Sequence, residues 1–409
     1  FLYSAIVLVL AVIHVFANEL ADEFTKISNL DGLNLSSISY SIHQFSKTLF
    51  EALKKDDPSN FICSPLGINF ILSMLYFGAR GTTKKLLETS LKLHKDENDI
   101  LRGYQQLIDS LSNVKKTEMQ LASKLFTLNE PRPEFKEIIE SSLGSEAQCI
   151  DLTNTAEASD IINNWCASRT NNKITQIIEP DDLEDAQMVL VSAIHFKSSW
   201  KRPFNPKNTK NRIFYTSEET HVNVPTMFAC KKFHWGPIPN LNATFIKLPF
   251  KNTIKNDALS MYIIRPDDIN GLRNGGSIFD NIDFNLLRGE FGKVLLNLPK
   301  FKIESMLNLE LVLTKMGMSE IFGEGANFTG INNQSNLHVS NIIQKVFINV
   351  DELGSEAAAV TVARLSARFY VEYVKPKPFI VDRPFVYLIV HTITNTVLFQ
   401  GQVYNPIET

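Results

Sequence analysis

The sequence predicts an α+β fold, because helical patterns come early in the chain and strand patterns come late. Apolar residues recur every three to four positions in the first part of the chain, whereas short apolar or alternating runs follow from residue 188 onward. This order favours large, mostly antiparallel sheets over a regular βαβ repeat. No internal repeat, low-complexity tract or Pro/Gly/Ser-rich linker divides residues 18–409, so we expect one large domain.

Four helices are expected in the first third of the chain. Each segment spaces its apolar residues so that they share one helical face. Gly78 is expected to close the second helix, since glycine readily adopts the conformation of a helix C-terminus. The expected helices cover Ile38–Leu53, Gly67–Phe77, Thr82–Leu91 and Ile100–Leu111.

Strands are expected in the second half. Most are short runs rich in β-branched and aromatic residues, and the last is continuously apolar, which is typical of a strand buried on both faces. The expected strands cover Met188–Phe196, Phe245–Phe250, Ser260–Ile264, Lys293–Leu298 and Phe385–Val390.

Composition excludes several classes of protein. Of 409 residues, 44% are hydrophobic and 21% charged, which is globular rather than disordered composition. The formal net charge of -3 creates no field that would gather nucleic acid, so no nucleic-acid partner is expected. The basic residues between Lys197 and Arg212, with Lys231 and Lys232, are interpreted as a solvated face. No feature of the sequence supports or excludes glycosaminoglycan binding.

Signatures of catalysis and of cofactor binding are missing from the sequence. There is no Gly-x-Ser-x-Gly or His-Glu-x-x-His motif, and the eight histidines are scattered. The segment Gly78–Lys84 lacks the spacing of a phosphate-binding loop and is interpreted as a turn between helices. We therefore expect no enzyme activity, no catalytic residue, no cofactor and no metal.

The N-terminal segment indicates secretion. Leu2–Phe16 is apolar but too short to cross a bilayer, and it ends in the small-residue pattern of a cleavage site, so residues 1–17 are interpreted as a signal peptide. An uncleaved membrane anchor is the alternative. Four acceptor triplets agree with an extracellular glycoprotein. These lie at Asn34, Asn242, Asn327 and Asn333. The four cysteines are too few for a disulfide scaffold, and Cys149 and Cys166 are either bridged or free.

One segment has conflicting local preferences. Residues 352–369 read ELGSEAAAVTVARLSARF, in which the run after the glycine favours helix and the valines favour strand. In an extended chain, Glu356, Arg364 and Arg368 share one face, and the other face carries only small or uncharged residues. Such a segment can become an inner strand of a sheet, because its uncharged face can be buried.

This segment resembles the hinge and reactive loop of the serpins, a family of serine-protease inhibitors. Asp351–Ala359 is similar to the family's hinge, although Leu353 replaces the usual second acid. Further segments resemble the family's second helix, the turn after it, the tryptophan-bearing strand, two strand ends and the C-terminal signature. They are Asn60–Pro65, Gly78–Thr82, Phe196–Phe204, Leu298–Phe301, Asp382–Phe385 and Phe399–Pro406.

The resemblance implies a single serpin domain over residues 18–409, with about eight to nine helices and an exposed reactive loop over about 352–381. It implies a monomeric inhibitor that a protease attacks as a substrate, forming an acyl-enzyme. The cleaved loop then inserts into the main sheet and traps the protease in a covalent one-to-one complex. The implied hinge residues are Glu352, Gly354, Ser355, Glu356, Ala357, Ala358, Ala359 and Thr361.

Counting along the loop from the hinge glycine, as in inhibitory serpins, places the bait bond between Arg368 and Phe369. Arginine there suits the acidic specificity pocket of a trypsin-like protease. Arg364 would leave too short an insertion, and Lys375 and Lys377 precede prolines. Tyr370 or Tyr373 would serve a chymotrypsin-like protease, and counting back from the C-terminal signature favours Tyr373.

The resemblance also locates the point where the loop enters and the gate that it must open. Trp200 stands where the loop enters. Ser64 is kept in the gate, whereas Ser192 replaces an asparagine and Gln344 a histidine, and Gly67 replaces a serine next to them. The hydrogen bonding of the gate is therefore expected to be rewired.

A non-inhibitory serpin that carries a ligand or acts as a chaperone is the principal alternative. Such relatives place charged or bulky residues, or proline, on the inserting face, and none occurs there between Ser355 and Ala363. A glycan-binding or cell-surface interaction protein would need a basic stripe on Ile100–Leu111, where Arg102 is the only basic residue.

Overall fold

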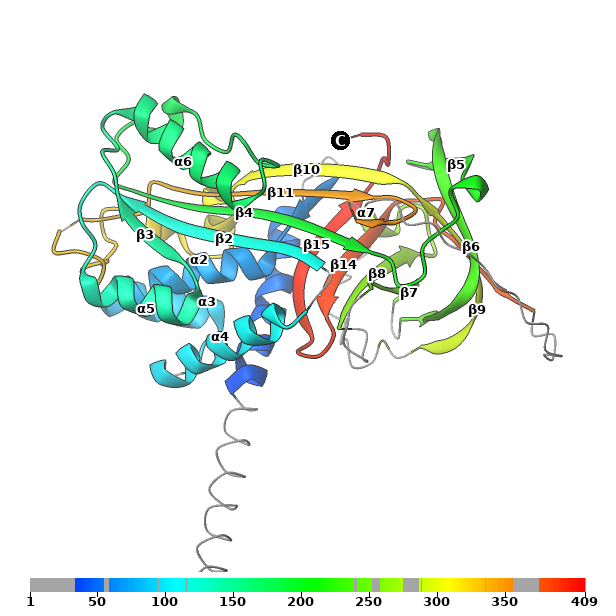
Figure 1. Ribbon diagram of the computed structural model, residues 1–409, viewed down its shortest axis with the longest axis horizontal. Helices are drawn as coiled ribbons and strands as arrows, with labels where there is room; N and C mark the ends of the chain where they lie inside the picture. The colour runs from blue at the N-terminus through cyan, green and yellow to red at the C-terminus, as the bar shows by residue number, and fades with distance from the viewer. Residues whose placement is uncertain are drawn as a thin grey trace, which may run out of the picture.

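The structure of the chain is a computed structural model. It describes residues 34–54, 59–94, 96–114, 117–238, 241–251, 258–274, 287, 289–334, 336–355 and 375–408. Two sheets and a group of helices make up this part of the chain (Figure 1).

The main sheet has six strands in the order β10-β11-β12-β4-β2-β3. Its pairings are antiparallel except for the parallel pairs β2 with β3 and β11 with β4. The strands are β2 (Thr117–Thr127), β3 (Glu146–Cys149), β4 (Met188–Ser199), β10 (Phe301–Asn308), β11 (Asn341–Val350) and β12 (Gly354–Ser355).

The second sheet has nine strands, in the order β1-β15-β14-β8-β7-β6-β9-β13 with β5 paired to β6. Every residue of β14 is buried, as expected for a strand covered on both faces. The strands are β1 (Phe61–Cys63), β5 (Lys210–Tyr215), β6 (His221–Pro237), β7 (Ala243–Pro249), β8 (Leu259–Pro266), β9 (Glu290–Pro299), β13 (Lys377–Ile380), β14 (Phe385–His391) and β15 (Thr396–Val403).

The expected helices are all present, and each is slightly longer than the sequence pattern indicated. A helix over residues 34–53 comes first. It is followed by α2 (Pro65–Gly78), α3 (Gly81–Leu91), α4 (Glu97–Ser112), α5 (Pro133–Leu143), α6 (Thr155–Arg169), α7 (Gly271–Asn274) and α8 (Glu310–Lys315). Short 3-10 helices cover Pro180–Leu183, Pro206–Asn208 and Ser319–Phe322. The α+β fold class is thereby confirmed.

Every residue of helix α2 is buried. Its end differs from the expectation, because Gly78 is the last helical residue and Ala79 follows it in an extended conformation. A Cβ on Gly78 would lie 2.3 Å from Cγ1 of Ile331. Close packing, and not a left-handed cap, therefore requires glycine at position 78.

The main sheet is covered on both faces by different groups of apolar side chains. In Figure 1, α6 lies above the sheet and α2 to α5 lie below it. Leu190 and Ile194 of β4 join the large core between the two sheets and α2. Val191 and Ala193, which alternate with them, join a smaller core under α6. Both faces of β4 are therefore buried along much of its length.

The described cysteines are all free, so the possible Cys149–Cys166 bridge is not formed. Within the described residues, no helix is both long and apolar enough to span a membrane. The same part of the chain holds no cluster of His, Cys, Asp and Glu that could bind a metal ion.

Candidate functional site

The main sheet is parted at one end, and the start of the predicted loop lies in the gap. Strands β11 and β4 pair directly from Asn341 with Val189 to Phe347 with His195. Beyond that point, β12 separates them: Gly354 and Ser355 pair with Ser199 and Ser198 of β4, and Ser355 also pairs with Val350 of β11. The sheet therefore already holds the first two residues of an additional central strand.

Only glycine fits at the first position of β12. A Cβ on Gly354 would lie 2.0 Å from the carbonyl oxygen of Ser198 and 2.6 Å from Cα of Ser199. The next residue, Ser355, is fully buried, and its hydroxyl donates to the carbonyl of Phe196 at 3.5 Å. A small residue at each position thus lets the chain enter between the strands.

Trp200 holds the segment that precedes β12. Its ring stacks on Phe250, with 4.6 Å between ring centroids and 9° between the planes. Its Nε1 donates to the carbonyl of Asp351 at 2.9 Å, and its backbone N–H donates to the carbonyl of Leu353 at 2.8 Å. These contacts place Trp200 beside the segment that leads into β12.

Glu352 makes an ion pair and a side-chain hydrogen bond in this segment. Nζ of Lys300 lies 2.9 Å from Oε2 of Glu352, and the hydroxyl of Thr209 donates to Oε1 at 2.7 Å. Burial acts to raise the pKa of Glu352, but the hydrogen bonds from Lys300 and Thr209 outweigh it and hold the pKa below its ordinary value. Glu352 therefore stays ionised. It ties the base of the hinge to Lys300, between β9 and β10, and to Thr209, which directly precedes β5.

The gate joins β11, β4 and the start of α2 through one amide side chain. Gln344 lies directly opposite Ser192 in the parallel pair, and its Nε2 donates to the Ser192 hydroxyl at 3.4 Å. Gln344 also binds both backbone groups of Ser64, whose hydroxyl donates to the carbonyl of Leu398 at 2.6 Å. Gln344 thereby links β11 to β4 and to the start of α2.

Gly67 makes room for this arrangement. A Cβ on Gly67 would lie 2.7 Å from Oγ of Ser192 and 2.5 Å from Cδ1 of Ile194. The serine that the family resemblance implies here would collide with the side chains now present. Glycine at position 67 thus leaves the space in which the side chain of Gln344 packs beside Ser192.

Sequence reasoning missed Lys300, Thr209 and Phe250 as partners of the hinge. Lys300 lies in the segment Leu298–Phe301, which the resemblance had already singled out. Thr209 and Phe250 carried no signal, because their roles depend on strands that the chain brings together only when folded.

Several predicted residues lie outside the described part of the chain. They are the signal peptide of residues 1–17, the bait residues Arg368 and Phe369, the alternatives Tyr370 and Tyr373, and the hinge residues Glu356, Ala357, Ala358, Ala359 and Thr361.

The four acceptor asparagines differ in accessibility. Asn242 and Asn333 are exposed, whereas Asn34 and Asn327 are half-buried. Oδ1 of Asn327 accepts from the hydroxyl of Thr329 at 2.8 Å, and Nδ2 of Asn34 donates to Asp99 at 3.4 Å. Of the two exposed asparagines, Asn333 accepts a hydrogen bond from Arg132 through its side chain.

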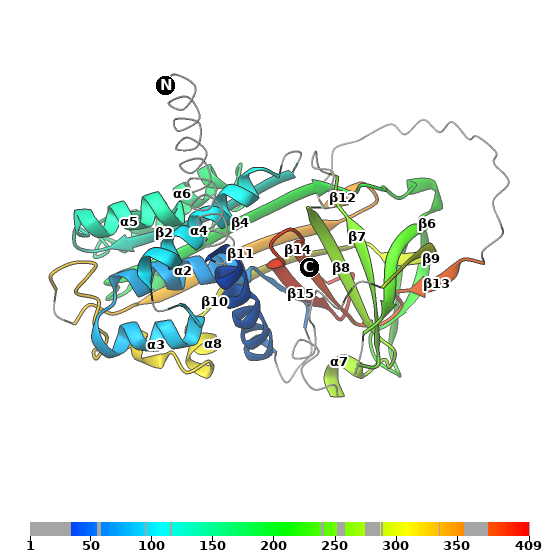
Figure 2. The ribbon, with the colours of Figure 1, turned by 90° about the horizontal axis from the view of Figure 1, so that it is seen from below.

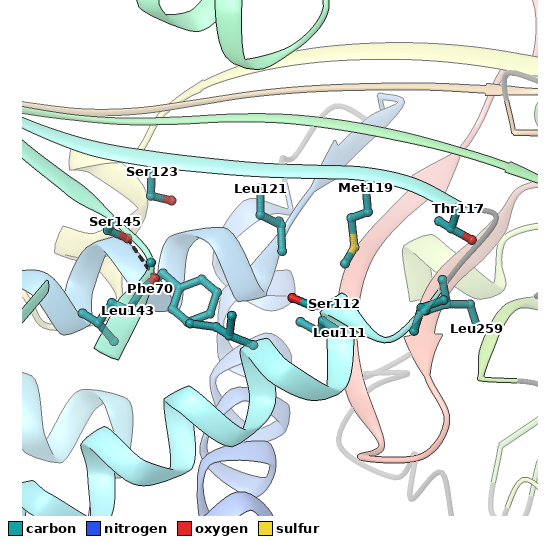
Figure 3. A pocket seen from close by; sticks show the side chains of 13 residues that line it. Phe70, Leu111, Ser112, Thr117, Met119, Leu121, Ser123, Leu143, Ser145 and Leu259 are labelled. Carbon is teal, nitrogen blue, oxygen red and sulfur yellow. Dashed lines mark hydrogen bonds between the residues drawn. The ribbon is translucent and has the colours of Figure 1, made fainter. Parts of the chain in front are cut away.

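A pocket of about 270 Å³ lies between α4 and β2 (Figure 3). Phe70, Leu111, Met119 and Leu121 form much of its wall, with hydroxyls from Ser112 and Ser123. No lining residue belongs to β4, β11 or β12. Its lining residues Thr117 and Ser123 pair with Ser198 and Ser192 of β4, so the pocket lies one strand away from the loop entry and the gate.

Comparison with known proteins agrees with this geometry. The family model described as Serpin (serine protease inhibitor) matches residues 40–406. Serpin B8 of Homo sapiens is 33% identical over 376 residues, covering 88% of this chain and 97% of that protein. Iris of Ixodes ricinus is 31% identical, covering 90% and 99%. The leukocyte elastase inhibitor of Sus scrofa is 30% identical, covering 91% and 100%.

Solved structures show the same fold. Serpin48 of the insect Tenebrio molitor superposes with a TM-score of 0.79 at 30% identity, covering 90% of this chain and 98% of that one. Human thyroxine-binding globulin, complexed with thyroxine, gives a TM-score of 0.79 at 27% identity, covering 92% and 100%.

Proposed function

Because the chain belongs to the serpin family of serine-protease inhibitors, we propose that it irreversibly inhibits trypsin-like proteases by inserting its cleaved reactive loop into the main sheet. The protease serine would attack the bond between Arg368 and Phe369 and form an acyl-enzyme. The chain after Ser355 would then continue β12 between β4 and β11, and the tethered protease would be carried along.

The insertion of Gly354 and Ser355 is the observation that carries this proposal. A non-inserting loop needs no place in the sheet, whereas here two residues already pair with β4 and β11. Each further residue that entered the sheet would add backbone hydrogen bonds and bury its side chain. The direction of the energy change therefore favours insertion once the loop is cut.

Extending the register of β12 shows which side chains would meet. Ala357 would lie opposite Phe196, Thr361 opposite Ser192 and Ala363 opposite Leu190, all toward the large core. This face of the loop carries only small or uncharged residues, so no charge would be buried there.

The opposite face of the inserted loop would contact protein side chains as well as solvent. In the same register Val360 would lie opposite Ala193 and Val362 opposite Val191, within the small core under α6. Both valines share the face of the extended chain that also carries Glu356, Arg364 and Arg368. The two valines would gain apolar contacts with this small core once α6 has made room for the strand.

We further propose secretion, signal cleavage after residue 17 and glycosylation, with Asn242 as the principal site. The apolar segment Leu2–Phe16 and the exposure of Asn242 support this part of the proposal.

Incubation with active trypsin tests the proposed function. An inhibitor gives an SDS-stable complex, and N-terminal sequencing of the released C-terminal fragment should begin at Phe369. A fragment that begins after Tyr370 or Tyr373 would assign the bait to a chymotrypsin-like protease. Complete cleavage without a stable complex, by trypsin, chymotrypsin and elastase alike, would exclude inhibition by insertion.

A further inference from the structure

One face of the second sheet carries an unusual pairing of like charges. In the antiparallel pair β6 with β9, Lys232 lies directly opposite Lys293, and His234 lies directly opposite Phe291. All four residues are exposed. Residues opposite each other in an antiparallel pair project from the same side of the sheet. We call these four residues, with Arg202, the basic face.

Arg202 adds a third positive charge to this face. Its Nη1 donates to the carbonyl of Lys232 at 2.8 Å, and its guanidinium carbon lies 5.7 Å from the ring centroid of Phe291. These contacts hold the guanidinium against the backbone of Lys232 and over the ring of Phe291. The charge of Arg202 is therefore fixed in place and not free to move away.

No described carboxylate forms an ion pair with Lys232 or Lys293. Glu290 is the acidic residue of β9, but it alternates with Phe291 and so projects from the other side of the sheet. Like charges directly opposite each other destabilise a sheet. The folded chain thus bears a local repulsion that an anionic partner would relieve.

An apolar contact lies within this positive field. Phe291 is 51% exposed, and its ring centroid lies 4.8 Å from that of His234. Arginine and aromatic residues are enriched where proteins contact each other, and such residues often dominate the binding energy. A polyanion such as a sulfated glycan calls for a longer row of charges without an exposed aromatic ring. The basic face therefore fits a protein surface that presents carboxylates around an apolar spot.

The basic face lies between the two ends of the predicted reactive loop. Arg202 follows Trp200, which binds the segment that precedes β12. At the other end, β13 runs parallel to β9, with Lys377 opposite Val294, so the chain approaches β13 from the end of β9 that carries Phe291 and Lys293. Figure 2 shows β6, β9 and β13 side by side at this end of the molecule. A protease bound to the loop would therefore stand over this face.

We propose that the basic face is a second docking surface, which binds an acidic patch of the protease that the reactive loop engages. This inference rests on the proposed inhibition of a protease and adds the property that selects among proteases of equal cleavage specificity. Opposite charges on the two surfaces would accelerate encounter and hold the protease over the loop before cleavage.

The test uses anionic and cationic trypsin, which share a preference for arginine but differ in surface charge. With the catalytic serine replaced by alanine, each trypsin forms only the non-covalent complex, and its association rate is measured by surface plasmon resonance. The variant is Lys232→Gln with Lys293→Gln. The matched control is Lys85→Gln with Lys315→Gln, which removes two exposed lysines from α3 and α8 at the other end of the molecule.

The Lys232/Lys293 variant should associate with anionic trypsin about tenfold more slowly than the unaltered chain at about 50 mM salt, and the difference should shrink at about 0.5 M salt. The control variant should be unchanged, and cationic trypsin should respond little to either variant. Equal rates for the two variants would overturn the proposal. So would loss of heparin binding in the Lys232/Lys293 variant with unaltered trypsin association, because the face would then be a polysaccharide site.

A separate readout keeps the two proposals apart. The SDS-stable complex with active trypsin reports on loop insertion, whereas the non-covalent association rate reports on the basic face. Face-dependent association without a stable complex would contradict the inhibitory function and support docking. A stable complex, together with an association rate that does not depend on Lys232 and Lys293, would support the inhibitory function and contradict docking at the basic face.

Discussion

The side-chain amide of Gln344 and the backbone of Ser64 exchange two hydrogen bonds across 280 positions of sequence. The Ser64 N–H donates to Oε1 of Gln344 at 2.7 Å, and the Ser64 carbonyl accepts from Nε2 at 3.0 Å. Because Ser64 also caps α2, the same amide ties β11 to the central helix. The gate is thus closed by a glutamine that satisfies buried backbone groups.

The first prediction concerns this amide. Gln344→Ala should lower the free energy of unfolding by about 2 kcal/mol, because it leaves the buried N–H and carbonyl of Ser64 without their partner. Urea unfolding followed by tryptophan fluorescence measures the change. Gln176→Ala, at an exposed position, is the control and should change stability little. Equal stability of the two variants would show that the amide is not needed to close the gate.

Gly354→Ala should convert the inhibitor into a substrate. The added Cβ would collide with the carbonyl of Ser198, so the loop could not start between β4 and β11. Titration of trypsin should require a larger molar excess of the variant, and cleaved chain should replace the SDS-stable complex. Gly325→Ala is the matched control, since a Cβ there meets nothing within 4 Å. Unchanged stoichiometry for Gly354→Ala would refute the role of β12.

Arg368→Ala should reduce the rate of trypsin inhibition at least about 100-fold, because the acidic specificity pocket loses its partner. Folding should be unaffected, as checked by circular dichroism. Arg364→Ala serves as the control and should keep most of the rate. The reverse result would move the bait bond to Arg364.

His391 should make stability depend on pH. Its imidazole is buried, Nδ1 lies 2.8 Å from the hydroxyl of Thr394, and burial lowers its pKa to about 4. Since the unfolded chain binds a proton more readily, the contribution of neutral His391 is complete above about pH 6.5 and is lost as the pH falls toward 4. The loss is on the order of 3 kcal/mol.

Urea unfolding at about pH 7 and pH 5 measures this dependence. His391→Gln should weaken it, because glutamine does not take up a proton, whereas His94→Gln, at an exposed position, should leave it intact. The same pH dependence in all three proteins would assign the effect to other groups.

Glu352 and Lys300 should be energetically coupled. A double-mutant cycle with Glu352→Gln and Lys300→Met should give a coupling energy of about 1–2 kcal/mol, since the carboxylate is largely buried. The pKa of Glu352 is lowered, so this coupling is present at neutral pH and is lost as the pH falls through that lowered value. Asp99 and Arg102, an exposed pair at 3.8 Å, should show coupling near zero in a parallel cycle.

The sequence predicted the elements of the fold better than the contacts between them. Periodicity found the first four helices and the buried strand Phe385–His391, because each pattern is local. Gly78 was placed correctly at a helix end but for the wrong reason, since its neighbour Ile331 is far away in sequence. Local signals cannot report such packing.

For the candidate site, too, the sequence predicted individual residues better than the contacts between them. Motifs identified Gly354, Trp200 and the gate residues, and the structure brings each of them to the parted end or the closed centre of the main sheet. The two hydrogen bonds from Gln344 to Ser64 and the contact of Lys300 with Glu352 required the folded chain, because their partners come from different strands. Likewise, the alternating pattern of a strand could not predict that α6 covers Val191 and Ala193.

The two residues of β12 have a kinetic consequence. The first contacts between a mobile segment and a sheet are the slowest to form, because closing the loop costs entropy before any bond repays it. Gly354 and Ser355 have already made those contacts, so they act as a preformed nucleus with the register fixed. In the proposed mechanism, the cut loop would extend β12 one residue pair at a time without searching for its partners. Trapping would compete with hydrolysis of the acyl-enzyme, and the first step of insertion would already be complete.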